Sequence, residues 1–92
     1  MANAIVTLKI MPTTPETNLE ELQKKALKEI AQFNDNKETK ISIEPIAFGL
    51  KAIIIIFVMD EAKGSPDAVA EKIANFEDVN SAEVTDVRRA IG

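Results

Sequence analysis

The sequence predicts an α+β sandwich, in which two helices cover one face of a four-stranded antiparallel sheet. Three observations support this prediction. Four segments are rich in β-branched and aliphatic residues, two segments place apolar residues at helical spacing, and together they follow the order strand, helix, strand, strand, helix, strand. Two split βαβ units joined by a hairpin have this order, which is that of the ferredoxin-like fold, with the first and third strands central.

The first strand is predicted from Ile5 to Met11 and ends at Pro12. Asn18 then begins a helix, with Glu21 three residues later in the spacing of a capping box. The segment Asn34-Asp35-Asn36 ends this helix. Its buried face is expected to consist of the apolar residues at helical spacing, which are Leu19, Leu22, Ala26, Ile30 and Phe33.

The second and third strands are predicted to form a hairpin. The second runs from about Thr39 to Phe48 and contains Pro45, which cannot donate to a ladder, so this strand should lie at a sheet edge. The third runs from Ala52 to Met59 and has no polar face, as expected of a central strand. Because the helices cover only one face of the sheet, some apolar side chains of the third strand should be exposed or covered by something else; the candidates are Ile54, Ile56 and Val58, or else their alternates.

The second helix is predicted to start at Gly64-Ser65-Pro66-Asp67, which combines a turn glycine, a serine cap, a proline in the first helical position and an acid in the first turn. Its buried face should consist of Val69, Ile73 and Phe76. The last strand is predicted from about Ala82 to Val87. The charged residues in and after it are typical of an edge strand that avoids unwanted pairing.

Composition limits the possible functions. The 92 residues correspond to one domain, residues 1–92, with a net charge of −4, so a nonspecific grip on nucleic acid is disfavoured. The chain has no cysteine and no histidine, which excludes disulfides and removes the usual ligands of zinc, haem and copper. The start lacks a signal-peptide pattern, and the longest apolar run is far shorter than the roughly twenty residues that cross a bilayer. We therefore expect a cytoplasmic protein that carries no cofactor or metal and contacts neither nucleic acid nor membrane.

Several function classes occur on this fold. An RNA-recognition domain would place aromatic residues on both central strands, and here only Phe57 lies on either of them. For an enzyme, His and Cys are missing from the usual nucleophile–base constellations, and we interpret the adjacent Asp60 and Glu61 as a solvated loop pair. A binding module is the favoured class. A small-ligand regulatory or other interaction domain remains the alternative.

The segment Phe48-Gly49-Leu50-Lys51 is the candidate binding site between the second and third strands. Glycine permits a tight connection from which Phe48 and Lys51 could project, and contact residues tend to lie on loops of a rigid scaffold. The alternative interpretation is that Phe48 is the last core residue of its strand and that Gly49 forms an ordinary turn.

Three segments together resemble a known family, the archaeal translation elongation factor one-beta family. They are Val6-Thr7-Leu8-Lys9-Ile10-Met11-Pro12, the Phe48–Lys51 segment and Val84-Thr85-Asp86-Val87-Arg88-Arg89. The chain is also similar to the C-terminal exchange domain of the eukaryotic counterpart. The resemblance covers essentially the whole chain. It implies a guanine nucleotide exchange factor, without covalent chemistry, whose partner is the GTPase elongation factor one-alpha.

The resemblance also implies roles for particular residues. In the eukaryotic family a basic residue near the C-terminus disturbs the magnesium site of the GTPase; the matching position is Arg89, with Arg88 its neighbour, where eukaryotic members have lysine. Phe48, Gly49 and Lys51 match the loop that lies against the GTPase. Lys51 would pair with a carboxylate of the partner or lie along the apolar surface beside it. Taken alone, Arg88 and Arg89 could equally be a solvated basic end.

Overall fold

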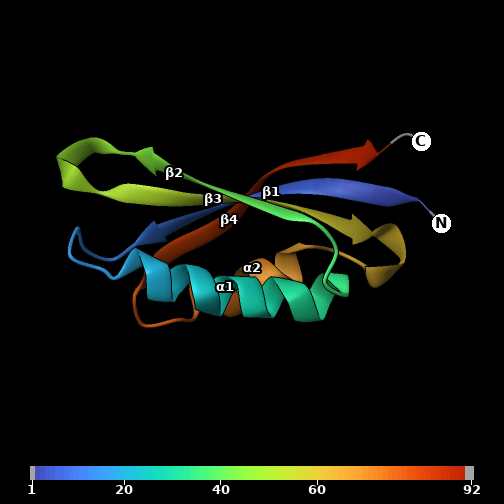
Figure 1. Ribbon diagram of the computed structural model, residues 1–92, viewed down its shortest axis with the longest axis horizontal. Helices are drawn as coiled ribbons and strands as arrows, with labels where there is room; N and C mark the ends of the chain where they lie inside the picture. Colours follow the sequence, from blue (N-terminus) through green and yellow to red (C-terminus); the bar gives the residue numbers. More distant parts are fainter. Residues whose placement is uncertain (1, 91–92) are drawn as a thin grey trace.

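The computed structural model describes residues 2–90 and confirms the predicted fold class. One antiparallel sheet has the strand order β2-β3-β1-β4, and both helices lie on the same face of it (Figure 1). In chain order the elements are β1 (Asn3–Pro12), α1 (Leu19–Asn34), β2 (Thr39–Pro45), the 3-10 turn η1 (Ala47–Gly49), β3 (Lys51–Asp60), the 3-10 turn η2 (Glu61–Lys63), α2 (Asp67–Ala74) and β4 (Val79–Ala90). β1 and β3 are central, and β2, which contains Pro45, is an edge strand as predicted.

The core lies between the sheet and the two helices. Alternate residues of β1 are buried and lie opposite alternate residues of β3, as in the pairs Val6 with Phe57 and Leu8 with Ile55. Directly opposite residues of antiparallel strands share a face, so both central strands direct one row of side chains toward the helices. The helices complete the core with Leu22, Ala26 and Ile30 from α1 and with Val69, Ala70 and Ile73 from α2.

The other face of the sheet is not covered by a helix. Ile5 of β1 and Ile56 of β3 are each 38% exposed there, and Ile54 and Val58 are half-buried. This confirms the expectation that the apolar third strand leaves part of its side chains exposed on the uncovered face.

Neither helix within residues 2–90 has the length and apolar character needed to cross a bilayer.

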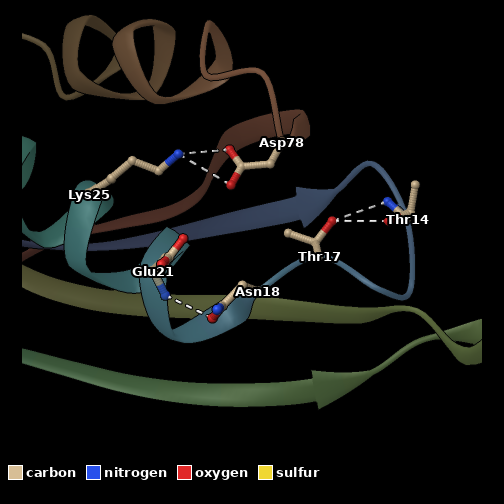
Figure 2. Close-up of polar contacts among 6 residues, drawn as sticks. All are labelled: Thr14, Thr17, Asn18, Glu21, Lys25 and Asp78. Carbon is tan, nitrogen blue, oxygen red and sulfur yellow. Dashed lines mark hydrogen bonds and ion pairs between the residues drawn. The ribbon is translucent and has the colours of Figure 1, made fainter.

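Local polar contacts fix the ends of α1. Asn18 caps its start, because the backbone N–H of Glu21 donates to Asn18 Oδ1 at 3.2 Å (Figure 2). Lys25, one turn further on, forms an ion pair with Asp78 at 3.2 Å, which ties α1 to the segment before β4. At the other end Asp35 adopts a left-handed conformation with φ 56°, and so terminates the helix as predicted. The N-cap of α2 is Pro66 and not the predicted Ser65, although Ser65 Oγ still accepts from the N–H of Asp67 at 3.1 Å just before the helix.

Two predicted strand ranges are wrong, and one residue predicted on the buried face of the second helix lies outside that helix. The second strand ends at Pro45 instead of Phe48, because the chain turns there and the N–H of Ile46 donates to the carbonyl of Leu50 at 2.7 Å. The last strand extends from Val79 to Ala90 and therefore includes both arginines, because β1 begins at Asn3 and offers ladder partners along this whole length. α2 ends at Ala74, so Phe76 follows the helix and is only half-buried.

Asn34 joins the end of α1 to the sheet. Its side chain is completely buried, and Nδ2 donates to the carbonyl of Val58 at 2.9 Å. We predict that Asn34→Ala lowers the free energy of unfolding by about 1–3 kcal/mol, because it leaves a cavity and removes this buried hydrogen bond. Gln32→Ala, on the exposed side of the same helix, should change it by about 0.5 kcal/mol or less. Urea denaturation measures both variants; equal losses would contradict a specific role of Asn34.

Candidate functional site

Phe48 projects from the tip of the β2–β3 hairpin. It adopts a left-handed conformation with φ 64°, and its exposed fraction is 94%. The interpretation of Phe48 as a core residue is therefore wrong. A left-handed conformation costs a residue other than glycine about 1–2 kcal/mol, and a strained backbone held by its surroundings is typical of functional positions. Gly49 follows with φ 77°, a conformation that glycine adopts without this cost.

The hairpin tip rests beside the loop between β1 and α1. A Cβ placed on Gly49 would lie 4.0 Å from Cβ of Pro15, which is ordinary van der Waals contact, so φ and not space favours glycine here. The loop is in turn bonded to the segment before β4, since the N–H of Thr13 donates to the carbonyl of Asp78 at 3.0 Å. Lys51 opens β3 and is exposed, and it makes no ion pair within residues 2–90. The tip thus presents an exposed aromatic ring and an exposed cation on a connection between two strands.

Arg88 and Arg89 lie on opposite faces of β4. Arg89 pairs in register with the buried Ala4, so its side chain belongs to the face that carries the helices, whereas Arg88 pairs with Ile5 on the uncovered face. A β-bulge decides this assignment. The register shifts between Thr7 and Leu8, where Thr85 of β4 is the extra residue. Strict alternation from the half-buried Val84 would have exchanged the faces of the two arginines.

Each arginine has a carboxylate partner, and the two pairs differ. Arg89 Nε lies 2.9 Å from Glu61 Oε2, and its Nη2 lies 3.1 Å from Oε1, so the contact is bidentate and joins β4 to η2. These hydrogen bonds and the charge of Glu61 raise the pKa of Arg89. Arg88 makes one bond, from Nε to Asp86 Oδ2 at 3.0 Å, to a residue of its own strand. The side chains of Arg88 and Arg89 are 80% and 72% exposed.

The structure places the candidate residues at two separate ends of the molecule. Phe48, Gly49 and Lys51 lie together at the hairpin tip, beyond the pair Ile10–Ile53 of the central strands. Arg88 and Arg89 lie opposite the start of β1. In Figure 1 the hairpin and the end of β4 point away from each other along the longest dimension, which is 42 Å. The two groups do not form one pocket.

Sequence reasoning missed Glu61 as a functional candidate, because it is 28 residues from Arg89 and nothing local links the two. The bulge did leave a signal. Val84 and Val87 are three residues apart, which conflicts with the two-residue period of a regular strand. Within residues 2–90, no group of three or more acidic side chains is arranged to hold a metal ion.

An exposed aromatic tip at one end of an elongated sheet and exposed, ion-paired arginines at the other are the features of a binding module. The family can be named from the sequence of the whole chain. The model of the EF-1 guanine nucleotide exchange domain matches residues 5–90, and the chain belongs to this family.

Similar proteins agree with this assignment. Elongation factor 1-beta of Methanobrevibacter smithii is 42% identical over 97% of this chain and 98% of its own length. The protein of the same name from Methanocaldococcus jannaschii is 37% identical over 98% of this chain and 100% of its own. The resemblance to archaeal translation elongation factor one-beta is thereby confirmed. Among solved structures, the de novo designed protein Foldit4 has a TM-score of 0.64 at 17% identity and covers 98% of both chains, a likeness that concerns the fold alone.

We predict that Phe48→Ala leaves the free energy of unfolding within about 0.5 kcal/mol of the original value, because the ring is exposed and the strained backbone stays unchanged. Phe57→Ala is the matched control, since Phe57 is fully buried on β3 and its truncation should cost about 3–5 kcal/mol. Thermal and urea denaturation compare the two variants. A large loss for Phe48→Ala would mean that the tip packs against the protein after all.

Proposed function

We propose that this chain is a guanine nucleotide exchange factor of translation elongation, which promotes the release of GDP from elongation factor one-alpha and its reloading with GTP in the cytoplasm. The observation that supports this most directly is the family match over residues 5–90, because it includes both the hairpin tip and the arginine end. We take residues 1–92 as one exchange domain.

Exchange requires binding energy and no covalent chemistry. A factor that binds the nucleotide-free GTPase better than the loaded one must weaken nucleotide binding by the same ratio, since coupling between two ligands is reciprocal. A rigid sheet with contact residues at both ends suits this task. The chain needs no nucleophile or base for it, which agrees with the composition.

Arg89, with Arg88 beside it, is the proposed exchange trigger. In GTPases of this kind a magnesium ion bridges phosphate oxygens of the nucleotide, and protein side chains hold the metal. A cation brought to that site competes with the metal and loosens the nucleotide. Arg89 is 72% exposed and carries the positive charge of an arginine, and its hydrogen bonds to Glu61 and the charge of Glu61 raise its pKa further. A planar guanidinium can also bind phosphate oxygens in pairs, which a lysine cannot do.

The hairpin tip is the proposed anchor, formed by Phe48, Gly49 and Lys51. A single aromatic side chain that becomes fully desolvated can dominate an interface. Because tip and trigger lie at opposite ends of a molecule 42 Å long, the GTPase would have to contact both ends, with an apolar pocket for Phe48 and its phosphate site near Arg89. Binding and exchange would then depend on different residues.

The direct test is the rate of GDP release from the cognate elongation factor one-alpha, followed with a fluorescent GDP. Catalytic amounts of this protein should accelerate release, because an exchange factor is not consumed. Unchanged release at saturating protein would refute the proposed function and favour a regulatory or other interaction domain of the same fold.

The separation of tip and trigger predicts different kinetic defects. Phe48→Ala should weaken binding to the GTPase by about 2 kcal/mol, roughly thirtyfold, with the maximal release rate nearly retained. Arg89→Ala should lower the maximal rate about tenfold or more, as expected when a hydrogen bond to a charged group is lost, with a smaller effect on binding. Raised magnesium should suppress exchange, because metal and arginine favour opposite states of one site.

Arg88→Ala is the matched control for the trigger, since Arg88 is the neighbouring cation on the other face of β4. It should reduce exchange less than Arg89→Ala. Release rate and affinity, measured for all three variants over a magnesium series, test this assignment. Equal effects of both arginine variants on affinity alone, without magnesium dependence, would make this end a simple basic contact.

A further inference from the structure

We propose that Glu61 is a positioning residue for Arg89, which holds the guanidinium by one edge and leaves the other edge free for a phosphate group of the GTPase-bound nucleotide. This inference rests on the proposed function. Glu61 itself does not contact the partner's phosphates in this arrangement; it acts through Arg89.

The bond geometry leaves room for a second anion. A guanidinium has five N–H donors in a fixed plane, and the contact with Glu61 uses Nε–H and one N–H of Nη2. The other N–H of Nη2 and both of Nη1 form no hydrogen bond within the part of the chain that the structure describes. Two of these three donors, one on Nη2 and one on Nη1, form the end-on edge, which matches two oxygens of a phosphate. Arg89 can therefore bind Glu61 and a phosphate at the same time.

The backbone that carries the Glu61 side chain is held from several sides. The N–H of Glu61 donates to the carbonyl of Ala2 at 3.1 Å, and its own carbonyl accepts from the N–H of Gly64 at 3.3 Å. The preceding Asp60 pairs in register with Asn3 and accepts a bond from the N–H of Ala62 at 2.9 Å. The side chain of Glu61 is 34% exposed, less than half the value for Arg89. A less exposed carboxylate on an anchored backbone thus meets a long and more exposed arginine side chain.

The bulge at Thr85 makes this contact possible. It turns Arg89 toward the helix-bearing face, where η2 follows β3, and turns Arg88 away from it. Immobilising a long side chain only at the moment of binding costs conformational entropy, and the pair with Glu61 removes part of that cost beforehand. Arg88 lacks such support, because its single bond goes to Asp86, an exposed residue of the same strand.

The opposite role would be a latch, in which Glu61 must release Arg89 before exchange. The two roles predict opposite effects of Glu61→Gln, which keeps the size of the side chain and removes its charge. If Glu61 is a positioning residue, Glu61→Gln should lower the maximal GDP release rate about fivefold. A factor of this size is expected from the loss of a well-formed exposed ion pair. A latch would make Glu61→Gln faster than the original protein.

The experiment compares Glu61→Gln with the matched control Asp86→Asn, which removes the partner of Arg88 and should leave the rate nearly unchanged. Glu61→Gln should have no further effect in the Arg89→Ala background, because its action passes through Arg89. In the isolated chain, nitrogen relaxation of the arginine side chains should show Arg89 Nε rigid in the original protein and mobile in Glu61→Gln, with Arg88 Nε mobile in both.

The outcomes separate this inference from the function on which it rests. If the original chain does not accelerate GDP release from the GTPase, the proposed function is wrong. The relaxation measurement still decides whether Glu61 holds Arg89. Two outcomes would contradict the positioning role while the proposed function stands, provided that the original chain accelerates GDP release. In the first, the Glu61→Gln variant gives a release rate equal to or higher than that of the original chain. In the second, Glu61→Gln slows release by the same factor in the Arg89→Ala background as in the original chain.

Discussion

The pairing of β1 with both β3 and β4 is the constraint on which the rest of the structure depends. β1 forms a ladder with β3 on one side and with β4 on the other, and its alternate residues, from Ala4 to Ile10, are buried against the helices. A shift of the register by one residue would move this whole row to the uncovered face, so burial of the apolar row fixes the pairing. Arg88 and Arg89 receive their places in space from this register.

The register explains why two adjacent arginines have different surroundings. In a strand, the side chains of neighbouring residues point to opposite faces of the sheet. The bulge between Val84 and Asp86 determines that Arg89 lies on the helix-bearing face and Arg88 on the uncovered face. Arg89 consequently reaches a carboxylate from another part of the chain, whereas Arg88 reaches one of its own strand. The same two residue types, side by side in sequence, thus become one braced and one loosely held cation.

The hairpin tip follows a different physical logic. Its exposed aromatic ring and left-handed Phe48 both work against the stability of the isolated chain, and neither is offset by contacts of the ring with the core. Such a conformation persists because backbone bonds close the turn, from the N–H of Ile46 to the carbonyl of Leu50 and from the N–H of Leu50 to the carbonyl of Ala47. A cost of this kind is expected where a surface is retained for contact with another molecule.

Much of the fold was determined by the sequence alone, because it rests on local signals. The alternation in Ile5–Met11, the apolar stripe and cap of the first helix, the Gly-Ser-Pro-Asp start of the second and the proline of the edge strand each act over a few residues, and their order leaves the ferredoxin-like arrangement as the consistent solution. The resemblance of three segments to a known family also identified the candidate residues without any coordinates. These signals did not determine strand ends, since a strand continues for as long as its neighbour offers partners, as β4 does alongside β1.

The tertiary structure alone decided the relations between distant residues. It showed that Phe48 projects and does not pack, that the tip and the arginines lie at opposite ends of the sheet, and that Arg89 is paired with Glu61. Each of these facts depends on a ladder register or a turn conformation that is set by the packing of the whole core. A sequence read residue by residue contains the side chains that can form such contacts, and only the folded sheet determines which of them meet.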